Sequence, residues 1–170
     1  YGIRACAKVR DNREELSKMV QELFIINLVM SMIAYAIFFA AIYFVPRFRQ
    51  DKELFLIIGL TIFFNAIGME WLYKALEQYT YITVRSIVFK FIAIVAMFLM
   101  VHEQSDYVIY GGISILASSA SNIFNFLHVH RYIDIKPTGH YNFKKHLNAI
   151  VIFFAMSCAT TIYTHLDTVM

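Results

Sequence analysis

The sequence has little charge and few residues that break helices. Of its 170 residues, 16% are charged and 59% are hydrophobic, with a mean hydropathy of +0.58. A typical soluble domain is about 25% charged, and a disordered chain combines low hydrophobicity with high net charge. Two prolines and six glycines exclude a collagen-like or linker-rich protein. We therefore expect an integral membrane protein, in which the 16 Phe and 11 Tyr can face lipid.

The sequence also lacks the motifs of soluble enzymes and of metal sites. It contains no GxxxxGK[ST], HExxH or GxSxG. Cys6 lies in a charged stretch and Cys158 in an apolar one, so we expect them at different depths and without a disulfide. We interpret His128 and His130 as interfacial histidines, because no Cys or carboxylate completes a tetrahedral metal site. The sequence therefore predicts neither a catalytic residue nor a metal site.

Five hydrophobic stretches are long enough to cross a bilayer as helices. A hydrocarbon core of about 30 Å requires roughly 20 helical residues. Strands of a membrane barrel would be about 9–11 residues long and would alternate in polarity. The longer, continuous runs seen here predict an all-α, polytopic transmembrane helix bundle. The predicted spans are 23–45, 54–73, 82–101, 107–129 and 147–166, with a cytoplasmic amphipathic segment at 1–22 and a cytoplasmic loop at 130–146.

The third stretch, 82–101, also fits a helix that lies in the membrane interface. It contains Arg85 and Lys90, and basic residues beside an apolar face are typical of interfacial helices. We favour a span, because Arg85 lies near one end and Lys90 can extend its side chain towards that end.

Lysine and arginine concentrate on one side of the predicted spans. The segments before span one, after span two and after span four carry five, three and four of these residues. The two intervening loops carry three and none. Because cytoplasmic loops carry an excess of Lys and Arg, we expect the N-terminal segment to lie in the cytoplasm.

A helix start is predicted close to the N-terminus. Asn12 is followed three residues later by Glu15, a spacing typical of a helix cap. Apolar residues then recur at helical spacing from Leu16 to Leu23. We expect an amphipathic helix that continues directly into the first span.

Polar residues follow one face of the fourth span in steps of three and four. This spacing places them on one side of a helix, and polar side chains within a membrane face protein or water. The stripe therefore predicts either one wall of a polar cavity or hydrogen bonds between helices. The candidate cavity residues in the stripe are Ser114, Ser118, Asn122 and Asn125.

A few charges fall in or near the spans. Glu70 is a candidate structural or gating charge. It can pair with Lys74 four residues later, or with Arg85 across the hairpin of spans two and three. Lys90, about 12 Å into its span by helical rise, is the best candidate for binding an anion, although it can instead extend to the interface. Asp167 is expected near the outer end of the fifth span, where water can reach it.

Three stretches resemble a known family. Gly68–Arg85 (GMEWLYKALEQYTYITVR) resembles the G-x-E-W-x-Y…E-x-Y-x-Y-I-x-x-R stretch of the bacterial flippases that export O-antigen, capsule and teichoic-acid repeat units. Tyr1–Lys18 is similar to the family's YG-x-R segment and the charged helix after it, and His165–Met170 to its L-D-T-x-M. Lys74–Ala75 and Ala5–Cys6 depart from the family pattern, so the role of position 74 stays open.

The resemblance implies a transporter with two pseudo-symmetric helical halves, of which this chain supplies about one. The implied substrate is an undecaprenyl-diphosphate-linked oligosaccharide, moved across the bacterial cytoplasmic membrane by alternating access, so no enzymatic activity is expected. Arg4, Arg85 and Lys90 are the cations expected to bind the diphosphate. No cofactor is implied beyond a coupling ion, a proton or sodium. The implied partners are the lipid-linked oligosaccharide, membrane lipid, a polysaccharide polymerase and chain-length proteins, with no nucleic acid.

Two other functions stay open at this point. A cation-coupled drug exporter of the same superfamily would need buried carboxylates, and only Glu70 and Asp167 lie near the spans. A membrane-embedded enzyme of polysaccharide assembly would need a large outer loop, whereas the predicted outer loops 46–53 and 102–106 are short.

Overall fold

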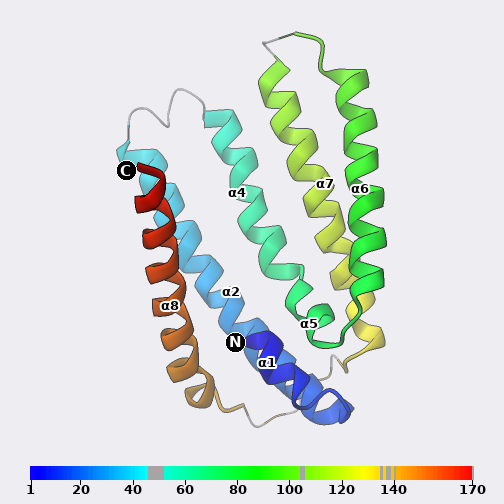
Figure 1. Cartoon of the computed structure of the whole chain (residues 1–170), viewed down its shortest axis with the longest axis vertical. Coiled ribbons are helices and arrows are strands. Elements are labelled where there is room, and N and C mark those ends of the chain that lie inside the picture. The colour runs from blue at the N-terminus through cyan, green and yellow to red at the C-terminus, as the bar shows by residue number, and fades with distance from the viewer. Residues whose placement is uncertain (46–51, 104–105, 135, 137–138, 140, 170) are drawn as a thin grey trace.

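The computed structural model describes residues 1–45, 52–103, 106–134, 136, 139 and 141–169, and it confirms the predicted all-α class (Figure 1). Within these ranges there is no β-strand. Short helices lie near the ends of the long ones. The short helices are α1 (Gly2–Ala7), α5 (Glu70–Ala75) and the 3-10 turn η2 (Val129–Arg131). The long helices are α2 (Arg13–Phe44), α4 (Lys52–Ile67), α6 (Tyr79–Met100), α7 (Tyr107–His128) and α8 (Lys144–Val169).

Four helical stretches are long and apolar enough to cross a membrane, which makes the chain a membrane protein. They are Arg13–Phe44, Phe55–Ala75, Tyr79–Met100 and Lys144–His165. Helix α7 has 22 residues, the length of a span, and it carries several serines and asparagines. It packs against both α4 and α6, and a helix with protein on two sides can carry polar residues within a membrane. We therefore count α7 as a span as well, the fourth of five along the chain.

The arrangement of α6 supports a span over residues 82–101. Helix α6 packs along α7 and runs beside it for most of its length (Figure 1). An interfacial helix would instead cross the ends of the bundle. The segments rich in Lys and Arg, at 1–22, 74–85, 130–134 and 141–146, lie at one end of the molecule, which we call the basic end (Figure 1).

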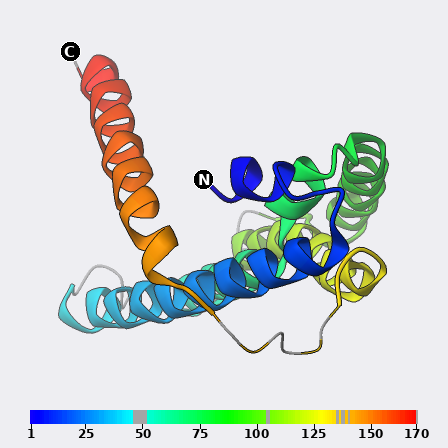
Figure 2. The ribbon, with the colours of Figure 1, turned by 90° about the horizontal axis from the view of Figure 1, so that it is seen from below.

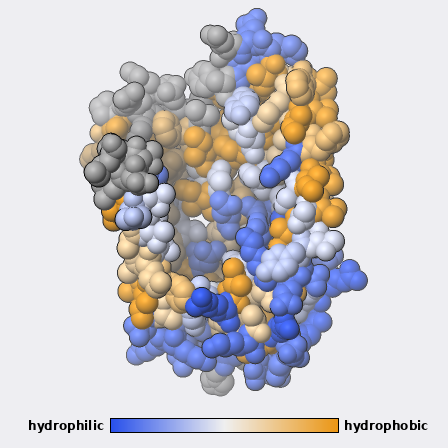
Figure 3. Space-filling model, viewed as in Figure 1, coloured by the Kyte–Doolittle hydropathy of each residue, from blue (hydrophilic) through white to orange (hydrophobic). Residues whose placement is uncertain are grey.

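Helices α2, α4 and α7 lie side by side, whereas α8 rises away from this layer (Figure 2). The space-filling view shows hydrophobic flanks between hydrophilic ends, as a membrane requires, and hydrophilic residues again in the hollow at its centre (Figure 3). The interior between the helices is therefore more polar than the outer flanks.

The well-packed core lies at the basic end, where α1, α2, α5 and η2 meet. Burial of an apolar side chain such as Leu or Val stabilises a fold by about 1.5–3 kcal/mol, so this cluster holds the four elements together. The buried members are Cys6, Leu16, Val20, Leu23, Met69, Leu72, Ala75, Val129 and Ile133.

The start of α2 agrees with the sequence prediction. The Asn12 side chain accepts hydrogen bonds from the backbone N–H groups of Glu14 and Glu15, at 3.1 and 3.3 Å. Such a cap satisfies N–H groups that the helix itself leaves unpaired. From this cap α2 continues without interruption to Phe44, so residues 13–22 and the first predicted span lie in one helix, whereas Gly2–Ala7 forms the separate helix α1.

The predicted second span, 54–73, differs from the observed helices. Helix α4 ends at Ile67, and α5 begins at Glu70 after Met69, whose backbone is left-handed at φ 42°. Gly68 packs so tightly against Asn122 of α7 that an added Cβ would collide with that side chain. This close approach turns the chain at the basic end and places Glu70 beside α6.

Within the predicted loop 130–146, some of the described residues are helical and some contact α2. Residues 129–131 form η2, and α8 already begins at Lys144. Arg13 pairs with Asp134 at 3.0 Å, and the Asp134 N–H donates to Ser17 Oγ at 2.9 Å. Asp134 is therefore held against the first turns of α2.

Candidate functional site

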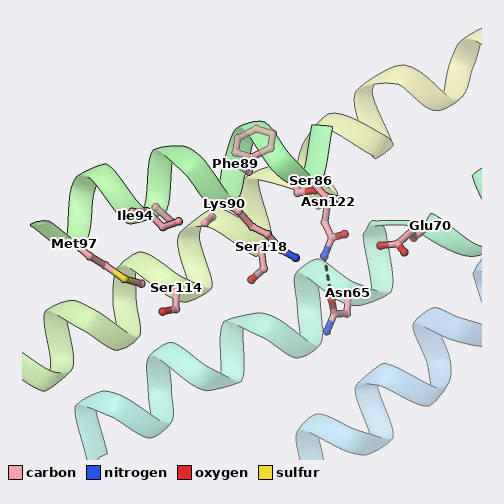
Figure 4. A pocket seen from close by; sticks show the side chains of 13 residues that line it. Asn65, Glu70, Ser86, Phe89, Lys90, Ile94, Met97, Ser114, Ser118 and Asn122 are labelled. Carbon is pink, nitrogen blue, oxygen red and sulfur yellow. Dashed lines mark hydrogen bonds between the residues drawn. The ribbon is translucent and has the colours of Figure 1, made fainter. Parts of the chain in front are cut away.

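A cavity of about 470 Å³ lies between α4, α6 and α7. Its lining is polar along α7 and mixed along α6 (Figure 4). The lining comprises Asn65, Glu70, Ser86, Phe89, Lys90, Ala93, Ile94, Met97, Ser114, Ala117, Ser118, Ser121 and Asn122.

The polar stripe of α7 serves both purposes that the sequence left open. Ser114, Ser118 and Asn122 line the cavity. Asn122 also donates from Nδ2 to Oδ1 of Asn65 on α4, at 2.9 Å (Figure 4). The stripe is therefore one wall of the cavity and at the same time a hydrogen-bonding contact between helices.

Asn125, the fourth candidate of the stripe, does not line the cavity. Its residue is 0% exposed, and its side-chain amide has no hydrogen-bond partner among the described residues. Its backbone carbonyl accepts a hydrogen bond of 2.6 Å from the buried Tyr73 hydroxyl of α5. Asn125 thus contributes to the junction between α5 and α7.

Lys90 is the cation of the cavity. Its side chain extends from α6 into the space between the helices, and its ammonium group points towards Ser118 (Figure 4). In the described part of the chain, no carboxylate lies within ion-pair distance of Lys90, which is exposed to the cavity. An unpaired ammonium beside hydroxyl and amide groups can bind an anion directly.

Glu70 forms both of the ion pairs that the sequence offered as alternatives. Its Oε1 lies 2.8 Å from Nζ of Lys74, and its Oε2 lies 3.9 Å from Nη2 of Arg85. The Arg85 residue is only 8% exposed and lies over the ring of Tyr81, at 5.6 Å. Its Nε and Nη1 have no partner within the described ranges, and an unpaired buried donor costs about 1–3 kcal/mol.

Arg4 and Asp167 lie apart from this group. Arg4 is on α1 with its guanidinium 5.6 Å from the Phe153 ring of α8, and it does not line the cavity. Asp167 is in the last turn of α8, and its side chain lies outside the described part. Lys90 and Glu70 therefore both line the cavity, whereas Arg85 contacts Glu70 without lining it.

The wall supplied by α6 includes residues that the sequence analysis did not single out. Ser86, Ala93 and Met97 are separated from Lys90 by four, three and seven positions, and such spacings place residues on one helix face. The same periodicity that revealed the stripe on α7 would have revealed this face. Among the described residues, no group of three His, Cys, Asp or Glu is placed to hold a metal.

A comparison with family models matches residues 1–170 to the family described as "Polysaccharide biosynthesis protein". The chain belongs to this family. The match covers the complete sequence and agrees with the resemblance carried by Gly68–Arg85. Neither the search of curated proteins nor the search of solved structures found a match.

The cavity combines two kinds of wall, as small-molecule sites usually do. One kind offers hydroxyl and amide partners, and the other offers apolar contacts. Ser114, Ser118 and Asn122 offer the first kind of partner, and Phe89 and Ile94 offer the second.

Proposed function

We propose that this chain is part of a flippase that exports undecaprenyl-diphosphate-linked oligosaccharide repeat units across the cytoplasmic membrane. The basic end would face the cytoplasm, because Lys and Arg concentrate on that side of membrane proteins. Transport would proceed by alternating access, in which helical bundles rock about a central site. No bond is made or broken in this proposal, so no catalytic residue is needed.

The observation that carries the proposal is the free ammonium of Lys90 in a cavity with polar and apolar walls. The substrate combines a diphosphate, a saccharide and a lipid chain, and it needs a partner for each. Lys90 supplies a charge for the diphosphate, while the α7 stripe supplies hydrogen bonds for the sugar. The volume of about 470 Å³ falls within the range of about 300–1,000 Å³ that is usual for small-molecule sites.

Glu70 is the proposed gating charge. Its two carboxylate oxygens face Lys74 on α5 and Arg85 on α6. A small movement of α6 relative to α5 would shift the carboxylate from one cation to the other. Arg85 is therefore proposed to act on the substrate through Glu70 and the shape of the cavity, because its own side chain is buried. Arg4 would meet the diphosphate only outside this cavity.

The remaining expectations of the resemblance are part of the same proposal. The coupling ion would be a proton or sodium, and no further cofactor is required. A polysaccharide polymerase and chain-length proteins would receive the exported unit. A drug exporter has less support, because the cavity carboxylate Glu70 already has Lys74 as a partner at 2.8 Å and is not free for a cationic drug.

The role of Lys90 can be tested by replacing it in the full-length protein. We expect Lys90→Ala to lower the export of surface polysaccharide and to weaken binding of an undecaprenyl diphosphate lipid about tenfold or more, since hydrogen bonds to charged groups contribute about 1.5–3 kcal/mol. Lys90→Arg keeps the charge and should retain part of both. Export is measured in a strain that lacks the gene, with the protein level checked by immunoblot.

A matched control is Lys8→Ala, which removes an exposed lysine outside the cavity. It should export at the normal rate. If Lys90→Ala also exports normally at equal protein level, the proposed anion site is wrong.

A further inference from the structure

A second cavity, of about 450 Å³, lies at the basic end between α2, α7 and η2. It shares no lining residue with the cavity beside Lys90. Most of the residues that line it are aliphatic or aromatic, in contrast to the serines and asparagines beside Lys90. The interior of the second cavity therefore suits an apolar occupant.

This cavity is closed by the core on one side and has an exposed apolar rim on the other. Val20 and Met69 line it and belong to the buried core cluster of the basic end. Ile25 of α2 and Phe126 and Leu127 of α7 also line it, and they are 37%, 43% and 60% exposed. Both helices are counted here as membrane spans. A hydrocarbon chain of the surrounding bilayer can therefore enter between them.

The polar side chains of Gln21 and Tyr141, which also line the second cavity, are bonded within the protein. Gln21 Nε2 donates to the backbone carbonyls of Asp134 and Lys136, at 2.8 and 2.9 Å. The Tyr141 hydroxyl donates to Gln21 Oε1 at 2.9 Å. Buried polar groups need hydrogen-bond partners, and these two side chains find theirs without a ligand. An apolar chain can therefore occupy the interior without leaving them unpaired.

The mouth of the second cavity is basic. His130 lines it, Arg131 follows directly in η2, and Lys136 is held beside Gln21 by the bond to its carbonyl. The residues at positions 130, 131 and 136 are exposed. Within the described ranges, neither Arg131 nor Lys136 lies within ion-pair distance of a carboxylate.

Two carboxylates close to this mouth in the sequence have partners of their own. Asp134 pairs with Arg13 at 3.0 Å. Glu22, next to Gln21 on α2, is 4% exposed, and its Oε2 lies 2.6 Å from Nε2 of the buried His146. The mouth therefore keeps its positive charge. Basic pockets between transmembrane helices are a usual form of binding site for anionic lipid headgroups.

We propose that the second cavity binds one anionic phospholipid of the surrounding bilayer, with an acyl chain in the apolar interior and the phosphate beside Arg131 and Lys136. The apolar lining and the basic mouth complement the two parts of such a lipid. The site requires only that the chain is a membrane protein, and it does not depend on what the cavity beside Lys90 transports.

The test places the full-length protein in nanodiscs of phosphatidylethanolamine that contain a small fraction of phosphatidylglycerol with a diazirine in one acyl chain. After illumination, mass spectrometry should locate most cross-links in residues 20–25 and 126–133. An excess of unlabelled phosphatidylglycerol should remove these cross-links, whereas the same excess of phosphatidylethanolamine should leave them.

Three results would overturn the proposal. Cross-links spread evenly over exposed apolar residues such as Phe98 and Val151 would mean that lipid only surrounds the protein. Displacement of the probe by undecaprenyl phosphate more readily than by phosphatidylglycerol would assign the site to an isoprenoid lipid. Chemical cross-links between two copies of the chain across residues 20–25 and 126–133 would assign it to a dimer.

Variants show whether the mouth and the interior cause the binding. Arg131→Ala combined with Lys136→Ala should lower the cross-link yield about tenfold or more, because each basic residue near an anionic lipid favours binding. Lys8→Ala combined with Lys145→Ala removes the same charge from exposed lysines outside the cavity and should leave the yield unchanged. Ile25→Trp narrows the opening and should also lower the yield. An equal loss in the control pair would refute a specific site, and the wild-type map stands even if a variant fails to fold.

Discussion

Gly68 offers the sharpest test of how the cavity wall is packed. A Cβ at this position would overlap the side-chain atoms of Asn122, and the nearest of them belong to its amide group. Gly68→Ala must therefore push Asn122 away from α4 and break its 2.9 Å bond to Asn65. Overpacking costs about 1–3 kcal/mol, and a lost hydrogen bond costs about 0.5–1.5 kcal/mol. We expect a total loss of about 2–4 kcal/mol of stability.

The assay heats the full-length protein in detergent and measures the fraction that remains monodisperse at each temperature. Gly112→Ala is the matched control, because an added Cβ there meets no atom within 4 Å. Gly112 lies within α7, where alanine is favoured over glycine by about 0.5–1 kcal/mol, so this variant should unfold at the same temperature as the wild type or slightly higher.

A double variant separates the collision from other effects. Asn122→Ala alone should be destabilising, because it loses the bond to Asn65. Combined with Gly68→Ala, it removes the two amide atoms nearest the new methyl and leaves only the Cβ of residue 122, at 2.9 Å. The double variant should therefore lose less stability than the sum of the two single losses. If Gly68→Ala behaves like Gly112→Ala, or if the two changes are simply additive, the close approach of α4 and α7 is not as the structure shows.

Two further predictions concern the basic end. Cys6 is 0% exposed, and burial raises the pKa of its thiol to about 12. At pH 8 only about one such thiol in 10⁴ is then the reactive thiolate. Cys6 should therefore resist maleimide in the folded protein and react only after denaturation. Labelling is measured by mass spectrometry, and Cys158, which is partly exposed, is the internal comparison. Rapid labelling of Cys6 in the folded protein would contradict the packing of α1. Tyr73→Phe removes a buried hydrogen bond of 2.6 Å to the Asn125 carbonyl. This variant should lose about 1–3 kcal/mol of stability in the unfolding assay described above. Tyr79→Phe, at an exposed ring, should leave the stability nearly unchanged.

The sequence was sufficient for those features that depend on local periodicity. The length of the apolar runs predicts the helices, and the spacing of Ser114, Ser118 and Asn122 alone places them on one helix face. The Asn12 cap was predictable for the same reason, because a cap involves residues only two or three positions apart. Glu70 and Lys74 are likewise four positions apart, so their ion pair could be foreseen.

Features that join distant parts of the chain were not predictable in this way. The break after Ile67 depends on the approach of Asn122 to Gly68, and nothing near Gly68 in the sequence indicates that neighbour. Glu22 falls in an amphipathic, charged segment and His146 in a basic loop, where each would be interpreted as solvated. Their burial follows only from the way α8 returns to the start of α2.

The pairing of Glu22 with His146 also has a consequence for the order in which the molecule is made. The two residues are 124 positions apart, so the ribosome must synthesise α4, α6 and α7 before the carboxylate of Glu22 meets its imidazole. Until then Glu22 has to remain hydrated at the membrane surface, because an isolated buried charge is costly. The pairing of Glu22 with His146 is therefore a late step of biogenesis, and a chain arrested before residue 146 would leave Glu22 and the N-terminal end of α2 open to proteases.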